Sequence, residues 1–248
     1  MNILENQQLV EPVDGIYIDL EAQILQNIAR HLQGWEQPID TDRWLMQKLA
    51  EIGKLNQENI RLIAKRSGLS QTAAERMLNA AAEDAIKSLD PGLRYLAERG
   101  LAETAVKANK SKNVKQVVRD FRKQAKDTLN MCNTNMLYKA SEKYKGLVGN
   151  IAQEAWNVLN SGAAGVMSGV EARQQAVRRC IRQLNDKGIP AFVDKRGREW
   201  TPEAYVNMAM RNTAKSTAEE VQDARIRDAG CHLIPVSYTH LRAHETRG

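Results

Sequence analysis

The chain has 248 residues, of which 42% are hydrophobic, so it can bury the core of one large domain or two modest ones. Aromatic residues make up only 5%, which favours helices packed through small side chains over a β-sandwich. No apolar run is long enough to span a bilayer, and the amino terminus lacks a basic-then-apolar signal pattern. We therefore expect a protein kept in a cytosol-like compartment, with no membrane partner.

Neither the cysteines nor the histidines indicate a metal or redox site. The three cysteines are widely spaced and form no CxxC pair, which favours buried free thiols over a disulfide or zinc framework. His240 and His244 could share one helical face, but no third ligand and no helix signal accompany them. We expect no metal and no cofactor.

The net charge of +6 is unevenly distributed along the chain. Residues 1–104 carry a net charge of −5, residues 105–182 carry +10, and residues 183–248 carry +1. Such asymmetry indicates a polyanionic or acidic partner for the middle third. A solvated basic face that balances an acidic first domain is the alternative.

The first third of the chain is predicted to be helical. We expect a mobile tail over residues 1–12 and a compact helical domain over residues 13–104. Its first helix is predicted from Asp14 to Gly34, because apolar residues recur there at every third or fourth position.

A second helix is expected after an aspartate cap at Asp40 or Asp42. Trp44 and Leu49 are predicted to face inward on this helix, and Gly53 is predicted to end it.

Residues 63–78 are similar in pattern to a helix-turn-helix. A third helix is expected to end at Ser67–Gly68, and a fourth to begin at a Ser70 cap. Used on DNA, the motif would place three side chains against base edges, namely Gln71, Thr72 and Arg76. The surrounding domain is net negative, which opposes phosphate contacts and favours a structural role.

The longest periodic pattern covers residues 114–155. Apolar residues recur there at steps of three or four, at Val114, Val118, Phe121, Ala125, Leu129, Cys132, Met136, Ala140, Tyr144, Leu147, Ile151 and Ala155. The pattern predicts one long amphipathic helix, or two collinear helices with a weak point at Gly146 and Gly149. Such a helix needs a partner, either elsewhere in this chain or in another subunit.

A cationic row accompanies this apolar seam. Its members recur at steps of four, three and four and so share one helical face: Lys115, Arg119, Arg122 and Lys126. Four cations in a row predict contact with nucleic acid or with an acidic protein surface, and a plain solvated face is the alternative. No aromatic residue is interleaved with them, which argues against stacking on single strands.

Residues 160–169 are mostly small and predict a hinge, after which a further helix follows. Four arginines are expected on its outer face, namely Arg173, Arg178, Arg179 and Arg182. The last three join the cationic row as candidate interaction residues. Residues 105–187 are therefore predicted to form long basic amphipathic helices.

Residues 188–234 predict a hairpin, a helix and a final strand. Gly188 is expected to end the preceding helix, and two short strands flank a turn over residues 194–197. Thr201 is expected to cap a helix whose first residue is Pro202. The fold class is thus mainly α: an N-terminal helical domain, long amphipathic helices, and a small C-terminal α+β unit with a β-hairpin.

Within this block, residues 188–213 carry a recognisable set of positions: Asp194, Gly197, Arg198, Trp200, Tyr205, Met208 and Arg211. This set resembles a motif near the carboxyl-terminal end of phage minor capsid proteins, which are relatives of portal-proximal head-morphogenesis proteins. Asn212 departs from the family pattern, which often has Thr after the Arg. The resemblance extends over most of residues 13–234 and implies a low-copy structural protein of a tailed-phage head, acting near the portal in head assembly or DNA passage.

The resemblance implies that portal and other capsid proteins are the partners, with phage DNA a further candidate through the basic helix. It also implies a virion protein that is assembled in the host cytoplasm. No nucleophile–base pair, convergent carboxylates or cofactor loop stands out in the sequence, so we expect no enzyme and no small-molecule substrate. The alternative function is a helix-turn-helix DNA-binding regulator.

The last fourteen residues, 235–248, resemble the translation of a sequencing adapter. We expect this tail to be foreign to the natural protein, whose own chain would be truncated here.

Overall fold

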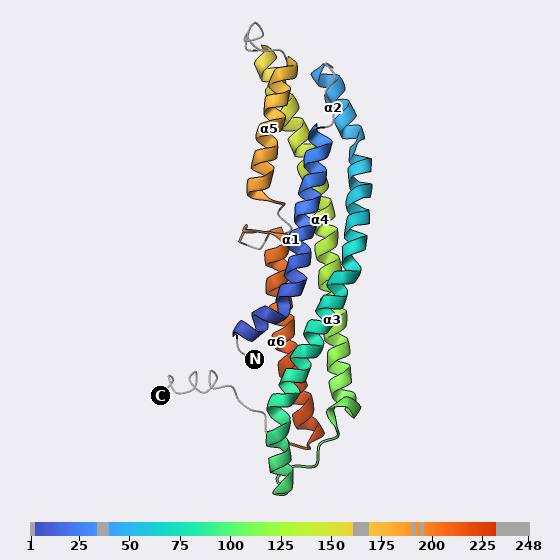
Figure 1. Ribbon diagram of the computed structural model, residues 1–248, viewed down its shortest axis with the longest axis vertical. Coiled ribbons are helices and arrows are strands. Elements are labelled where there is room, and N and C mark those ends of the chain that lie inside the picture. Colours follow the sequence, from blue (N-terminus) through green and yellow to red (C-terminus); the bar gives the residue numbers. More distant parts are fainter. Residues whose placement is uncertain (1–2, 34–39, 161–168, 190–191, 194–195, 232–248) are drawn as a thin grey trace, which may run out of the picture. The chain divides into compact units, whose positions relative to one another are not determined.

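The computed structural model describes residues 3–33, 40–160, 169–189, 192–193 and 196–231, and these are mainly helical (Figure 1). The elements in chain order are α1 (Ile3–Gln33), α2 (Thr41–Ala50), α3 (Ile52–Glu98), the 3-10 helix η1 (Ala108–Lys110), α4 (Lys112–Asn160), α5 (Gly169–Lys187), β1 (Phe192–Val193), β2 (Glu199–Trp200) and α6 (Pro202–Asp228). The two strands pair antiparallel. The predicted mainly α class with a small hairpin is confirmed.

The chain divides into two compact units, each built from separate segments of the sequence. Within the described residues, unit 1 comprises 3–9, 74–125 and 210–231, and unit 2 comprises 10–73 and 126–209 without the gaps given above. Helices α1, α3, α4 and α6 contribute residues to both units. The domain ranges predicted from the sequence remain a prediction. The expected hinge over residues 160–169, the strand at 231–234 and the tail at 235–248 lie largely or wholly outside the described residues.

The predicted helix-turn-helix is wrong, because α3 is one uninterrupted helix of 47 residues. Gly68 has a helical backbone with a negative φ. The Ser70 hydroxyl donates to the Ser67 carbonyl at 3.0 Å, and the Thr72 hydroxyl donates to the Gly68 carbonyl at 2.8 Å. These hydroxyls bond backward within the helix and do not cap a new one. The alternative function, a helix-turn-helix DNA-binding regulator, therefore no longer has the motif on which it was based.

Two helix boundaries also differ from the predictions. Helix α1 begins at Ile3 instead of Asp14 and carries Pro12 inside it, so the expected tail is helical from Ile3. Helix α2 starts as expected, because the Asp40 carboxylate accepts the backbone N–H of Arg43 at 2.8 Å. Gly53 does not end it, since α2 stops at Ala50 and Gly53 lies inside α3. Leu49 is exposed and not inward.

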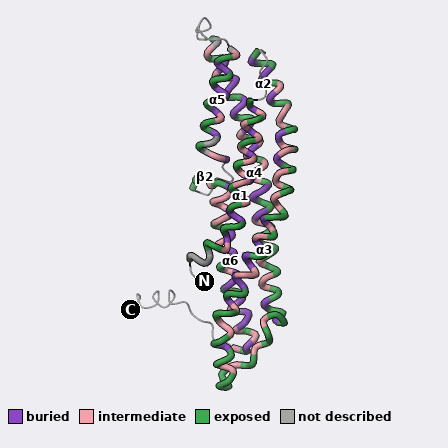
Figure 2. The backbone as a smooth tube through the Cα atoms, in the orientation of Figure 1, coloured by how far each residue is buried: buried purple, intermediate pink, exposed green. Residues whose placement is uncertain are grey.

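The apolar seam predicted for residues 114–155 lies on the single helix α4, so the expected weak point at Gly146 and Gly149 does not break it. All but two of its twelve residues are buried; Val118 and Phe121 are half-buried. Buried and exposed positions recur along the length of α3 and α4 (Figure 2). In unit 2, α4 meets α1, where the Tyr17 hydroxyl donates to the Asn133 side-chain oxygen at 3.0 Å.

The core of unit 1 is made of small residues. Its buried members are Ala82, Ala85, Val114, Ala218, Val221 and Ala224. Ile86, Val117 and Val118 pack against them and stay partly accessible. Because the chain has few aromatic residues, the helices of unit 1 pack against one another through alanine and valine.

A buried arginine connects three segments of unit 1. Arg225 on α6 donates from Nε and Nη2 to the two carboxylate oxygens of Asp90, at 2.8 and 3.0 Å. Its Nη1 donates to the Val106 carbonyl at 2.6 Å and to Asp228 at 3.2 Å. The Arg225 side chain is only 3% exposed. This cluster holds the connection between α3 and α4 against α6.

Replacing Gly68 with Ala tests the continuity of α3. Because a Cβ at Gly68 meets no atom within 4 Å and the backbone is helical, we expect the variant to be more stable by roughly 0.5–1 kcal/mol. Gly100→Ala is the matched control: it also meets no atom, but its φ of +70° disfavours a side chain, so stability should fall. Urea unfolding followed by circular dichroism measures both. If Gly68→Ala were less stable than the parent protein, the backbone at Gly68 would not be helical and the predicted turn would be supported.

Replacing Arg225 with Ala should lower the free energy of unfolding by about 3–5 kcal/mol, because Asp90 and Asp228 lose their buried partner. Arg225→Lys should cost nearly as much, since an ammonium cannot reproduce the two-pronged contact with Asp90. Arg227→Ala is the control on the exposed side of the same turn and should change stability by less than about 0.5 kcal/mol. Equal losses of stability at both positions would show that the buried contacts of Arg225 contribute no more than an exposed arginine does.

Candidate interaction surfaces

The cationic row predicted on α4 is exposed at all four positions. In unit 1, Arg122 Nη2 donates to the Asn79 side-chain oxygen on α3 at 2.7 Å, and Arg119 Nη1 donates to Gln116 at 3.4 Å. No carboxylate within 4 Å is recorded for any of the four residues in the described part of the chain. Their charge is therefore offered to solvent or to a partner, and their role stays a prediction.

Three residues of this row line a groove in unit 1. The groove has a volume of about 610 Å³ and is formed by α3, η1 and α4. Ile86, Val114 and Val118 give it an apolar floor, in which Val114 is buried and the other two are half-buried. The charged residues that line it are all exposed and comprise four cations and one anion: Lys87, Lys115, Arg119, Arg122 and Glu83. The groove thus combines apolar surface with positive charge.

The four arginines predicted on the outer face of α5 have different surroundings. Arg178 and Arg182 are exposed, whereas Arg179 pairs with Glu154 of α4 at 2.7 Å. The prediction for Arg173 is wrong, because it is only 4% exposed and its guanidinium lies 5.6 Å from the Trp44 ring of α2. Burial lowers the pKa of Arg173. The Trp44 ring offers the buried cation an aromatic face, which explains the inward position.

The hairpin and the start of α6 form a small aromatic unit. Phe192 lies opposite Trp200 across the strand pair, and its ring stacks on Tyr205 with centroids 3.7 Å apart. The Arg198 guanidinium lies 5.8 Å from the Trp200 ring. Gly197 adopts a φ of +78°, which the turn requires. Asp194 lies outside the described residues, and Arg211 lies half-buried on α6.

The helix caps around this block are as predicted. Gly188 adopts a φ of +63° just after α5, and its N–H donates to the Leu184 carbonyl at 3.0 Å. The Thr201 hydroxyl accepts the N–H of Ala204 at 3.2 Å, and α6 begins at Pro202.

Two carboxylates of α1, which the sequence analysis missed, hold this block in unit 2. Glu21 Oε1 accepts the backbone N–H of Ile189 at 2.9 Å, and a Cβ added to Gly188 would lie 2.6 Å from the same oxygen. Asp14 accepts the Asn207 side-chain amide. Burial raises the pKa of Glu21, the Ile189 N–H opposes this rise, and the charge of Glu203 adds to it. Their partners are more than 160 residues away, so no local pattern could have revealed them.

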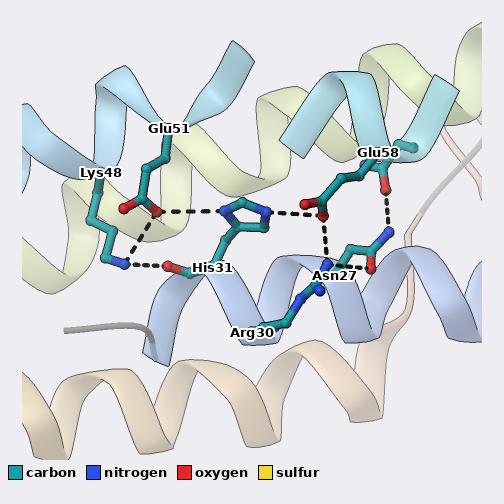
Figure 3. A network of polar contacts seen from close by, with 7 residues as sticks. Asn27, Arg30, His31, Lys48, Glu51 and Glu58 are labelled. Carbon is teal, nitrogen blue, oxygen red and sulfur yellow. Dashed lines mark hydrogen bonds and ion pairs between the residues drawn. The ribbon is translucent and has the colours of Figure 1, made fainter. Parts of the chain in front are cut away.

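A polar network joins α1, α2 and α3 (Figure 3). The His31 ring lies between Glu51 Oε2 at 3.5 Å and Glu58 Oε2 at 3.1 Å, as the close-up shows. Lys48 is fully buried and donates to the His31 carbonyl and to Glu51. Burial lowers the pKa of Lys48, and Glu51 opposes this shift. Arg30 completes the network through Glu58.

This network has histidine and carboxylates, but its members bond to one another. The ring of His31 also meets Tyr144 edge-on, with centroids 6.4 Å apart. The contacts of this network join α1, α2 and α3, so the network stabilises the junction of these helices. Among the described residues, no group of three or more His, Cys, Asp or Glu could hold a metal ion. No helix in that part of the chain is long and apolar enough to cross a membrane.

These features define a helical protein whose exposed chemistry consists of charged and apolar contact surfaces. The family model for phage minor capsid protein 2 matches residues 4–247, nearly the whole chain, and the protein belongs to this family. No curated protein and no solved structure gave a significant match. The family assigns the chain a structural role in a phage, and the resemblance seen in residues 188–213 is confirmed.

Glu21→Gln tests how α1 holds the hairpin block. The fold favours the protonated form of Glu21, so stability is lost as pH rises above about 4.5 and the carboxylate ionises. Gln keeps the acceptor for Ile189 without the charge. We therefore expect its advantage in free energy of unfolding over the parent protein to grow from pH 4 to pH 8, as measured by urea unfolding at each pH.

The control for this experiment is Glu21→Ala, which also lacks the charge but leaves the buried Ile189 N–H without an acceptor; it should be about 1–3 kcal/mol less stable than Glu21→Gln throughout the same pH range. A Gln variant that loses stability as pH rises would contradict the raised pKa.

Proposed function

We propose that this phage structural protein acts near the portal of a tailed-phage head, in head assembly or DNA passage. Family membership supports the structural role, and the cationic row on α4 is the observation that supports a polyanionic partner. Portal and other capsid proteins are the proposed partners, and phage DNA is a second candidate. The protein would be assembled in the host cytoplasm and retained in the virion.

We propose further that it is not an enzyme and takes no cofactor or small-molecule substrate. The ring of His31 contacts Glu51 and Glu58 at the junction of α1, α2 and α3, and Glu51 also pairs with Lys48. The groove in unit 1 brings together amines, guanidiniums and aliphatic side chains, with one carboxylate and no nucleophile–base pair. Such a lining suits binding of another macromolecule.

Mass spectrometry of purified particles tests the structural role. We expect the chain to copurify with mature heads at a low number of copies relative to the major capsid protein, and its absence from particles would refute the proposal. Crosslinking before disassembly should join it to the portal. Crosslinks confined to the outer shell would place it elsewhere in the head.

Reversing Arg119, Arg122 and Lys126 to Glu tests the cationic row. These positions are exposed, so the variant should fold with unchanged helicity. We expect fewer DNA-filled heads, because the row would then repel an anionic partner. Thermal melting and counts of filled and empty particles by electron microscopy measure the two effects.

The matched control reverses three other exposed lysines of α4, namely Lys112, Lys123 and Lys145. It changes the net charge by the same amount and should leave head filling near normal. An equal defect in both variants would assign the effect to net charge, and normal particles from the first variant would make the row a solvated face.

A further inference from the structure

The groove in unit 1 presents two chemistries that one partner must satisfy together. Its floor is formed by Ile86, Val114 and Val118, and the first and last of these are the accessible outer layer of the unit 1 core. Its volume of about 610 Å³ is within the range of ligand-binding pockets in proteins. A partner that fills the groove must therefore offer apolar groups.

The charged residues around this floor are strongly biased toward positive charge. Lys87 is on α3, and Lys115, Arg119 and Arg122 are on α4, so cations come from both helices. Glu83 is the one acidic residue among those lining the groove. Arg122 is bonded to Asn79 of α3, which fixes its guanidinium beside the groove. A partner that fills the groove must also carry negative charge at its edges.

We propose that this groove binds an acidic amphipathic helix of another structural protein. Such a helix would place apolar side chains at positions i, i+3 or i+4, and i+7 on the floor, and carboxylates beside the four cations. Glu83 and the cations together would set the register, because a basic residue of the partner fits only beside Glu83. This inference rests on the proposed function in one respect: that function implies that the helix comes from another structural protein of the phage.

Duplex or single-stranded DNA fits the same surface less well. An apolar floor gains nothing from phosphates, and Glu83 would repel them. The residues that line the groove include no aromatic side chain on which a base could stack. The acidic helix uses the whole lining, whereas DNA would use only the cations.

Binding of synthetic peptides to the purified full chain tests the proposal. The probe is a fluorescent 18-residue helical peptide with Leu at the i, i+3, i+4 and i+7 positions and mostly Glu elsewhere. A scrambled peptide of equal composition removes the apolar face, and a 20-base-pair DNA duplex supplies charge alone. We expect the amphipathic peptide to bind at least tenfold more tightly than the scrambled peptide, as measured by fluorescence anisotropy at physiological salt.

Two variants locate the binding surface. Lys115→Glu with Arg119→Glu, at exposed positions, should weaken the peptide at least tenfold, and Ile86→Ser should weaken it while leaving the effect of salt unchanged. Lys112→Glu with Lys123→Glu is the matched control on α4 and should bind like the parent protein. Circular dichroism confirms folding of each variant. If Ile86→Ser fails to fold, the scrambled peptide still tests the apolar floor.

Equal binding of the ordered and scrambled peptides, tighter binding of the duplex, or no peptide binding at 1 mM would each overturn the proposal. These results leave the presence of the protein in particles untouched, so failure here is distinguishable from failure of the structural role. A head-filling defect in the triple variant together with failed peptide binding would assign the cationic row to DNA.

Discussion

A helix of 47 or 49 residues in water requires apolar cover along its whole length, and this requirement governs the described structure. Isolated helices gain too little from backbone hydrogen bonds to persist, so tertiary burial must stabilise each successive turn. On α4 the cover is a narrow seam in which Leu129, Met136 and Tyr144 are fully buried. In unit 1 it is provided largely by alanine and valine, which lets helices come close without large side chains.

The same requirement explains where charge is buried. Arg225, Lys48 and Arg173 are all nearly inaccessible, and each lies where two or more segments meet. A buried cation is costly unless its donors are satisfied, so each meets a carboxylate, a carbonyl or an aromatic face. These contacts add directional requirements to apolar packing, which has none of its own. They fix which turns of neighbouring helices lie together.

Sequence patterns predicted the features that lie on a single helix and missed those that need several elements to come together. The seam and the exposed cationic row of α4 follow from residue spacing alone, and so does the Thr201 cap of α6. The break expected at Gly68 was wrong, because buried residues recur on both sides of it, with Asn59 before it and Ser70 and Ala74 after it, and their burial outweighs the weak helix preference of one glycine. The groove needed α3 and η1 beside α4, and the Glu21–Ile189 bond joins residues far apart in sequence, so neither had a local signal.

The block that carries the family resemblance and the surface that offers unpaired charge are different parts of the chain. In residues 188–213, Gly188, Phe192 and Thr201 are used by internal contacts: a helix end beside Glu21, a stacked ring and a cap. The groove, by contrast, is formed by side chains that the core of unit 1 leaves accessible. The motif residues therefore serve the fold, while the surface proposed to bind a partner lies on α3, η1 and α4. The contacts made by Gly188, Phe192 and Thr201 involve no residue of the cationic row. We therefore expect changes to the cationic row to alter binding without altering the fold of the motif.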